Sequence, residues 1–243
     1  FVEAEAQVRN ASAPRRSCIR VVVVTAQPSP TSATRNSGCT VASVRNTWLN
    51  DAWRYTGDVS SWAPMSADYE RGIVYIPTNP PTIDYFNGFR PGDNLYGTSV
   101  IALNVQTGER EWHFQTVHSD QWNYDLPNVP IVTDLRVNGR QIPAVIQTTK
   151  TGIIFAFNRE TGQPIWPIEE VPVLQTEVPG NWSAATQPIP THPEPFEPLG
   201  LPESDVIDFT PQLRAEAMAM LSRYRVGNPF MPRLWADQNT GFE

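Results

Sequence analysis

Two stretches of the chain follow one pattern: ALNVQTGEREW at residues 102–112 and AFNRETGQPIW at residues 156–166, 54 residues apart. Each reads as a strand, a tight turn that carries glycine, and a second strand that ends in tryptophan. The asparagine at the strand end can bond the turn backbone, and the glycine tolerates a positive φ angle. Trp112 and Trp166 are large apolar plates that can pack on a neighbouring unit. A repeat of this length predicts an all-β fold built of β-propeller blades.

Short apolar runs in and around the repeat predict strands at residues 72–77, 99–105, 144–149 and 153–158. Pro143 stands just before the third run, where a strand tolerates proline. Lys150 falls in the turn between the last two runs, near strand ends where binding sites are commonly built.

One helix is predicted near the C-terminus. Thr210 suits its N-cap, Pro211 its first position and Gly227 its C-terminal cap. Its apolar residues would share one face that packs on the rest of the molecule; they are Leu213, Ala217, Met220, Leu221 and Tyr224.

Composition excludes several classes of protein. The 243 residues carry a formal net charge of -7, which argues against a general nucleic-acid binder. No apolar run approaches the roughly 18 residues that a membrane span needs. Cys18 and Cys39 are too few for a disulfide framework and lack metal-ligand spacing. Lys150 is the only lysine among the 18 basic residues.

Residues 1–46 differ from the rest of the chain. No acidic residue lies between Glu5 and Asp51, and no aromatic residue between Phe1 and Trp48. We interpret 1–46 as a divergent segment that is disordered or corrupted by a frame shift at about residues 8–45, with one strand at 21–24. A basic arm for an acidic partner is the alternative. Residues 47–243 would form the propeller part.

The residues outside the repeat resemble a known family. From residue 48 to residue 227 the chain is similar to the quinoprotein alcohol and glucose dehydrogenases, in particular the glucose dehydrogenase-like branch. The resemblance is carried by residues 62–68, 72–80, 90–94, 112–118, 122–127, 149–152 and 208–211. It implies an eight-bladed β-propeller that binds pyrroloquinoline quinone (PQQ) and usually Ca²⁺. This chain would be an internal fragment of about three blades with a helical insertion near its C-terminus.

The resemblance also implies three binding residues. Trp62 falls where the family places the indole on which the quinone stacks. Asn79 falls where an amide oxygen binds Ca²⁺, which prefers oxygen ligands. Lys150 falls where a cation faces the quinone carbonyl oxygens and stabilises the charge that develops on reduction.

One position departs from the family. Its general base is an aspartate directly after the tryptophan of a His-x-Asp-x-Trp-Asp run, and that position is Asn123 here. An amide cannot take the proton of the substrate hydroxyl. Either Asp120 or Asp125 takes that proton, or the chain is catalytically impaired. Asp120 matches a family position whose role is structural.

The family therefore predicts oxidation of a sugar or alcohol CH–OH group, with electrons passed through the quinone to a respiratory quinone or cytochrome acceptor. It also predicts a location in the periplasm or at the periplasmic face of the inner membrane, with any membrane association through parts of the parent protein outside this chain. Two alternatives remain: a catalytically silent propeller that acts as a binding module, and a non-functional truncated product.

Overall fold

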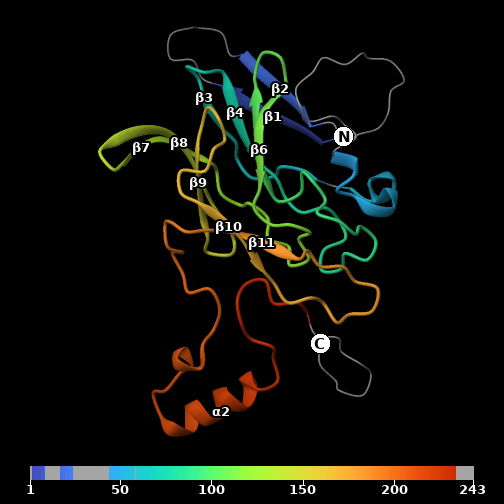
Figure 1. The fold of residues 1–243 in the computed structure, drawn as a ribbon, viewed down its shortest axis with the longest axis vertical. Helices are drawn as coiled ribbons and strands as arrows, with labels where there is room; N and C mark the ends of the chain where they lie inside the picture. Colours follow the sequence, from blue (N-terminus) through green and yellow to red (C-terminus); the bar gives the residue numbers. More distant parts are fainter. Residues whose placement is uncertain (1, 9–16, 24–43, 58, 234–243) are drawn as a thin grey trace.

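The computed structural model describes residues 2–8, 17–23, 44–57 and 59–233, and its strands pair antiparallel (Figure 1). Two sheets form its centre. The first has the order β3-β4-β5-β6, with bounds Ser66–Asp68, Ile73–Pro77, Ser99–Asn104 and Arg110–Gln115. The second has the order β7-β8-β9, with bounds Ile131–Val137, Arg140–Thr148 and Ile154–Asn158. The predicted strands at 72–77, 99–105, 144–149 and 153–158 are confirmed within a few residues.

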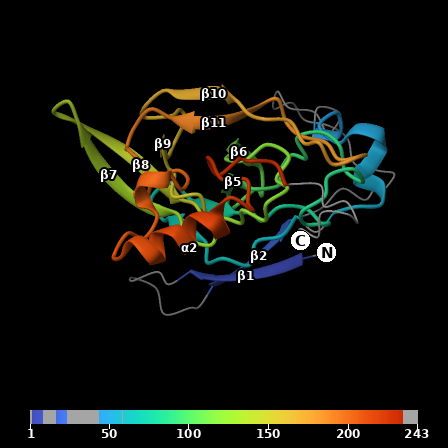
Figure 2. The same ribbon diagram turned by 90° about the horizontal axis from the view of Figure 1, so that it is seen from below.

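Two strand pairs and short helices complete the described part. The pairs are β1 (Val2–Val8) with β2 (Ser17–Val23), and β10 (Ile168–Pro172) with β11 (Thr186–Pro190). The helices are η1 (Leu49–Arg54), η2 (Glu203–Asp205) and α2 (Pro211–Leu221). The β7–β8 hairpin projects from one side of the molecule in both views (Figures 1 and 2). Within the described residues no helix is long and apolar enough to cross a membrane.

Strand β4 is buried on both of its faces. Ile73 and Tyr75 belong to a core shared with the second sheet, while Val74 and Ile76 belong to a second core on the other face. A strand covered on both sides needs an uninterrupted apolar run rather than an alternating one. Strand β4 therefore lies between two apolar layers.

The two repeats form the same turn. Asn104 Oδ1 accepts hydrogen bonds from two turn N–H groups at 3.0 and 3.2 Å, and Asn158 Oδ1 does the same at 2.9 and 3.2 Å. Gly108 and Gly162 have φ angles of 71° and 72°, which favour glycine. The predicted roles of asparagine and glycine in the repeat are confirmed.

Trp112 joins one repeat to the next. A Cβ atom on Gly162 would lie 2.6 Å from Trp112 Cγ, so the indole lies directly against this turn. Trp112 Nε1 donates a hydrogen bond to the Arg159 carbonyl at 3.1 Å. Nothing lies within 4 Å of the same position on Gly108. The expected packing of the repeat tryptophan on a neighbouring unit is thus observed for Trp112.

Pro143 is predicted to lie just before its strand, and this is wrong, because it lies inside the strand. Strand β8 begins at Arg140 and includes Pro143, which pairs with Asp134 of β7. The Pro143 carbonyl accepts a hydrogen bond from the Arg159 N–H, so this residue presents its backbone to the β9 side, just beyond the last strand residue Asn158. Proline is tolerated there because the Arg159 carbonyl, which an N–H at this position would face, accepts from Tyr75 OH and Trp112 Nε1 instead.

Helix α2 begins as predicted but ends earlier and does not pack. Thr210 Oγ1 accepts a hydrogen bond from Leu213 N at 3.2 Å, and Pro211 is the first helical residue. The helix ends at Leu221 with Ser222 as its C-cap, not at Gly227. Gly227 instead lies against Gly200, which must be glycine for this approach, since a Cβ on Gly200 would lie 2.2 Å from the Gly227 carbonyl. No residue of α2 is buried, so the predicted packing face is wrong for the described residues.

The first 46 residues are only partly described. Strands β1 and β2 pair from Val2–Val23 to Val8–Ser17, and β2 covers the predicted strand through residue 23. Residues 9–16 and 24–43 lie outside the described residues. The interpretation of 1–46 as divergent or corrupted therefore stays a prediction.

We expect acid to destabilise the fold through His113. Burial, assisted by the nearby Arg110, lowers the pKa of His113 to about 4, and its ring meets Tyr96 edge-on at 4.8 Å. An unfolded histidine binds a proton below about pH 6.5, so folding stability falls between about pH 6.5 and pH 4. The loss reaches up to about 3 kcal/mol.

Urea unfolding of the full chain at pH 7.5 and pH 4.5, compared with His113→Phe, measures this loss. The variant should lose clearly less stability than the wild type over this interval. Asp120, whose pKa is raised by burial, gives the opposite slope, but it is present in both proteins and cancels. Equal slopes in the two proteins would show that His113 is protonated as easily in the folded state as in the unfolded state.

Candidate functional site

The loop after β6 is built around the carboxylate of Asp120. Its two oxygens accept hydrogen bonds from Thr98 Oγ1 at 2.9 Å and from the backbone N–H groups of Trp122 and Tyr124, both at 2.8 Å. Asp120 is 2% exposed, and burial raises the pKa of its carboxyl group. The three bonds fold residues 120–124 into a fixed loop.

Arg90 holds this loop in place through hydrogen bonds to backbone carbonyls. It is fully buried, and its Nη2 donates hydrogen bonds to the carbonyls of Asp120 at 2.6 Å and Ile83 at 3.1 Å. Its Nη1 donates to Asn94 Oδ1 at 2.7 Å. Burial lowers the pKa of Arg90 to about 10. The sequence indicated only a loop at 90–94, because nothing in the pattern shows which distant carbonyls a buried guanidinium will bind.

Three residues that sequence reasoning considered separately come together at Lys150. Its Nζ donates to Asp125 Oδ2 at 2.5 Å and to the Asn123 carbonyl at 2.9 Å. The Lys150 side chain is 36% exposed and that of Asp125 is 13% exposed. Lys150 lies in the β8–β9 turn, as predicted. We call Asn123, Asp125 and Lys150 the lysine cluster.

Asn123 contributes its backbone to the lysine cluster. Its φ angle is 63°, a left-handed conformation that asparagine adopts more readily than most residues. The Lys150 bond goes to the carbonyl oxygen of Asn123 and not to its amide side chain. The loop conformation at this position therefore does not depend on a carboxylate at residue 123.

Trp62 and Asn79 lie on neighbouring segments that Ser60 connects. Asn79 Oδ1 accepts hydrogen bonds from Ser60 N at 2.7 Å and from Ser60 Oγ at 2.8 Å, and the Asn79 N–H donates to the Ser60 carbonyl at 3.0 Å. Trp62, two residues further on, is 60% exposed. An exposed indole fits the predicted role as a flat surface for a planar ring. Asn79 thus holds the segment that carries Trp62.

The Ca²⁺ role of Asn79 is not supported by the same geometry. Both acceptor positions of its amide oxygen are used by Ser60, so a metal ion would have to replace one of these bonds. Among the described residues no group of three or more histidine, cysteine, aspartate or glutamate side chains is placed to hold a metal ion. Ca²⁺ takes six to eight oxygen ligands, so most of them would have to come from elsewhere.

A segment near the C-terminus packs on the Asp120 loop. Phe230 is 3% exposed and meets the rings of Trp122 and Tyr124 edge-on at 5.6 and 6.2 Å. Trp122 Nε1 donates to the Met231 carbonyl at 2.7 Å, and Tyr124 OH donates to the Pro229 carbonyl at 2.6 Å. Burial raises the pKa of Tyr124 to about 12, so the phenol stays a donor. Sequence reasoning missed this contact, because the two segments are far apart in the chain.

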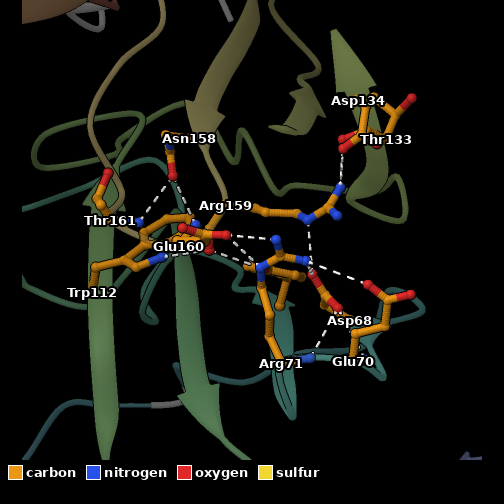
Figure 3. Close-up of polar contacts among 11 residues, drawn as sticks. Asp68, Glu70, Arg71, Trp112, Thr133, Asp134, Asn158, Arg159, Glu160 and Thr161 are labelled. Carbon is orange, nitrogen blue, oxygen red and sulfur yellow. Dashed lines mark hydrogen bonds and ion pairs between the residues drawn. The ribbon is translucent and has the colours of Figure 1, made fainter. Parts of the chain in front are cut away.

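An ionic cluster lies beside the turn of the second repeat (Figure 3). Arg159 Nε lies 2.7 Å from Asp68 Oδ2, and Arg159 Nη1 lies 2.9 Å from Asp134 Oδ1. Arg71 Nη1 lies 3.1 Å from Asp68 Oδ2, and its Nη2 lies 2.6 Å from Glu160 Oε1. These pairs link β3, β7 and the turn after β9. We interpret this ionic cluster as a connection between the two central sheets.

Comparison with known proteins places most of the chain in one family model. The model described as "PQQ: Glucose/ethanol/alcohol dehydrogenase, beta-propeller domain" matches residues 39–241. A quinoprotein glucose dehydrogenase from Escherichia coli (strain K12) is 40% identical over 130 residues, which are 53% of this chain and 16% of that protein. The glycerol dehydrogenase large subunit of Gluconobacter oxydans (strain 621H) is 38% identical over 158 residues, which are 64% of this chain and 21% of that protein.

A solved structure supports the fold. The quinohemoprotein alcohol dehydrogenase ADHIIG from Pseudomonas putida HK5 has a TM-score of 0.50 and 23% sequence identity. The alignment covers 78% of this chain and 27% of that one. The chain therefore spans about a quarter or less of the length of each of these three proteins.

Proposed function

The chain belongs to the PQQ glucose/ethanol/alcohol dehydrogenase β-propeller family, and from this premise we propose that it takes part in the PQQ-dependent oxidation of the CH–OH group of a sugar or alcohol. When bound, the quinone would accept the two electrons of this oxidation. The observation that carries the proposal is the lysine cluster. It presents the only lysine of the chain as a partly exposed cation, beside a carboxylate and at the turn between two strands.

Two side chains are suited to hold the cofactor. The exposed indole of Trp62 would stack on the planar ring system, and the Lys150 ammonium would face its carbonyl oxygens. The Ca²⁺ ion that the resemblance predicts would bind Asn79 only after the amide oxygen gives up one of its bonds to Ser60. We propose Ca²⁺ on the family resemblance alone.

We further propose that the chain works as part of a longer propeller, in the periplasm or at the periplasmic face of the inner membrane. Electrons would pass on to a respiratory quinone or cytochrome. The short span of the relatives that the chain covers supports the first of these points, and the resemblance to the family supports the others.

A second candidate function is a binding module that retains the cofactor surface without turnover. Asn123 favours this alternative, because an amide stands where the family places its base. A cofactor-binding test combined with a turnover test separates the two.

Replacing Lys150 by alanine should weaken quinone binding. Loss of a charged hydrogen-bond donor costs about 1.5–3 kcal/mol, which is about 10- to 100-fold in affinity. Quenching of tryptophan fluorescence by added PQQ, with and without Ca²⁺, measures the affinity of the full chain for the quinone. Dye reduction with D-glucose, glycerol or ethanol measures turnover on the same sample.

Arg140→Ala is the matched control, since Arg140 is an exposed cation at the far end of the β7–β8 hairpin. Quinone binding by the wild type, weakened in Lys150→Ala and unchanged in Arg140→Ala, is the expected result. If the wild type does not quench at all, or if both variants quench alike, the proposed cofactor site is wrong.

A further inference from the structure

We propose that Asp125 is the proton acceptor of this protein, in place of a carboxylate at position 123. This inference rests on the proposed function and makes it more specific. Oxidation of an alcohol to a carbonyl compound removes a hydride from carbon and a proton from oxygen. The quinone, when bound, would supply the acceptor for the hydride, so a side chain must take the proton, and the amide of Asn123 cannot.

Asp120 is excluded by its surroundings. Its side chain has three donors on two oxygens, and it is 2% exposed. Oδ2 uses both of its acceptor positions for Thr98 and Tyr124, and Oδ1, which accepts from Trp122, keeps one position that faces the protein interior. Asp120 therefore shapes the loop, and its burial leaves almost no surface at which a substrate hydroxyl could meet it.

Asp125 meets the requirements that Asp120 fails. Among the described residues its carboxylate has one hydrogen-bond partner, the Lys150 ammonium at 2.5 Å, and its side chain is 13% exposed. One oxygen can therefore accept a proton while the other holds the lysine. This carboxylate lies within one hydrogen bond of Lys150, the cation proposed to face the quinone.

Lys150 ties Asp125 to the position of the missing base. The same Nζ that bonds Asp125 bonds the carbonyl of Asn123 at 2.9 Å. The Asp125 carboxylate and the Asn123 carbonyl thus accept hydrogen bonds from the same ammonium group. A proton acceptor two residues along the loop can serve the same substrate position, because both residues contact the same cation.

Asp125→Asn tests the proposal with little change in shape, since the amide oxygen can still accept from Lys150. We expect quinone binding, measured by tryptophan quenching on the full chain, to stay within about threefold of the wild type. Turnover of D-glucose, glycerol or ethanol in the dye assay should fall about 100-fold or more, the usual contribution of a general base. Glu169→Gln, an exposed carboxylate on β10, is the control and should change neither readout.

Two further measurements show whether Asp125 accepts the proton or only pairs with the charge of Lys150. Asn123→Asp introduced into the Asp125→Asn protein should recover at least about tenfold of the lost turnover, because it supplies a carboxylate next to the same lysine. Acylation of Lys150, followed by peptide mass spectrometry without cofactor, should be several-fold faster in Asp125→Asn, since the carboxylate no longer holds the ammonium.

The outcomes that overturn the proposal differ from those that overturn the proposed function. Undiminished turnover in Asp125→Asn, or a wild type that binds the quinone without turnover, would show that Asp125 is not the acceptor. A wild type that does not bind the quinone overturns the proposed function and, with it, this role. Unchanged acylation in Asp125→Asn would show that the pair with Lys150 does not form in solution.

Discussion

Replacing Trp112 by alanine will lower the free energy of unfolding by about 3–5 kcal/mol, the range for a large buried aromatic residue. The indole is 7% exposed and packs on Tyr75 and Phe157 with ring centroids 5.8 and 5.7 Å apart. Its loss also leaves the Arg159 carbonyl without this donor. Because these contacts join the two central sheets, urea unfolding of the full chain should show the loss directly.

The repeat supplies matched controls for this prediction. Trp166 occupies the equivalent position but is only half-buried, so Trp166→Ala should cost clearly less. Gly162→Ala would drive a Cβ to 2.6 Å from Trp112, whereas Gly108→Ala meets nothing within 4 Å at almost the same φ angle. Both lose the freedom of glycine at positive φ, which costs about 1–2 kcal/mol. Equal losses in the two glycine variants would mean that Trp112 does not dock on the second turn.

The parts of the fold that follow from neighbouring residues could be predicted from the sequence. Asn158 bonds N–H groups two and three residues ahead, and Thr210 caps the helix that starts beside it. Such contacts depend only on a few adjacent residues, so a local sequence pattern is enough to predict them. The turn that holds Lys150 belongs to the same class, because two short strands joined by a few residues that include Gly152 leave little choice of connection.

The parts that depend on distant partners could not be predicted. The apolar residues of α2 suggested a packing face, yet Met220 is 62% exposed, because periodicity does not reveal whether a surface exists to receive it. Lys150 bonds Asp125, and Phe230 packs beside Trp122. In both pairs the residues lie far apart in the sequence, and no local pattern shows that they will meet. The resemblance to a family located the candidate residues, and the geometry shows which of them touch.

Arg159 shows this limit within the repeat itself, and replacing it has the second large effect that we expect. Its counterpart in the first repeat is Val105, so the pattern gives no reason to expect a charge there. Arg159→Met should lower the free energy of unfolding by about 3 kcal/mol or more, because it leaves the buried carboxylate of Asp68 without its nearest cation. Urea unfolding at neutral pH measures the loss.

Two further variants decide whether the loss comes from the unpaired charge. The double variant Asp68→Asn with Arg159→Met removes both charges, so it should be more stable than Arg159→Met alone. Arg71→Met removes a cation whose closest partner is the exposed Glu160, so it should cost clearly less than Arg159→Met. If Arg71→Met and Arg159→Met were equally destabilising, the ionic cluster would be a surface network. The connection between the two central sheets would then rest on Trp112 and its apolar neighbours, which the ionic cluster adjoins at the Arg159 carbonyl.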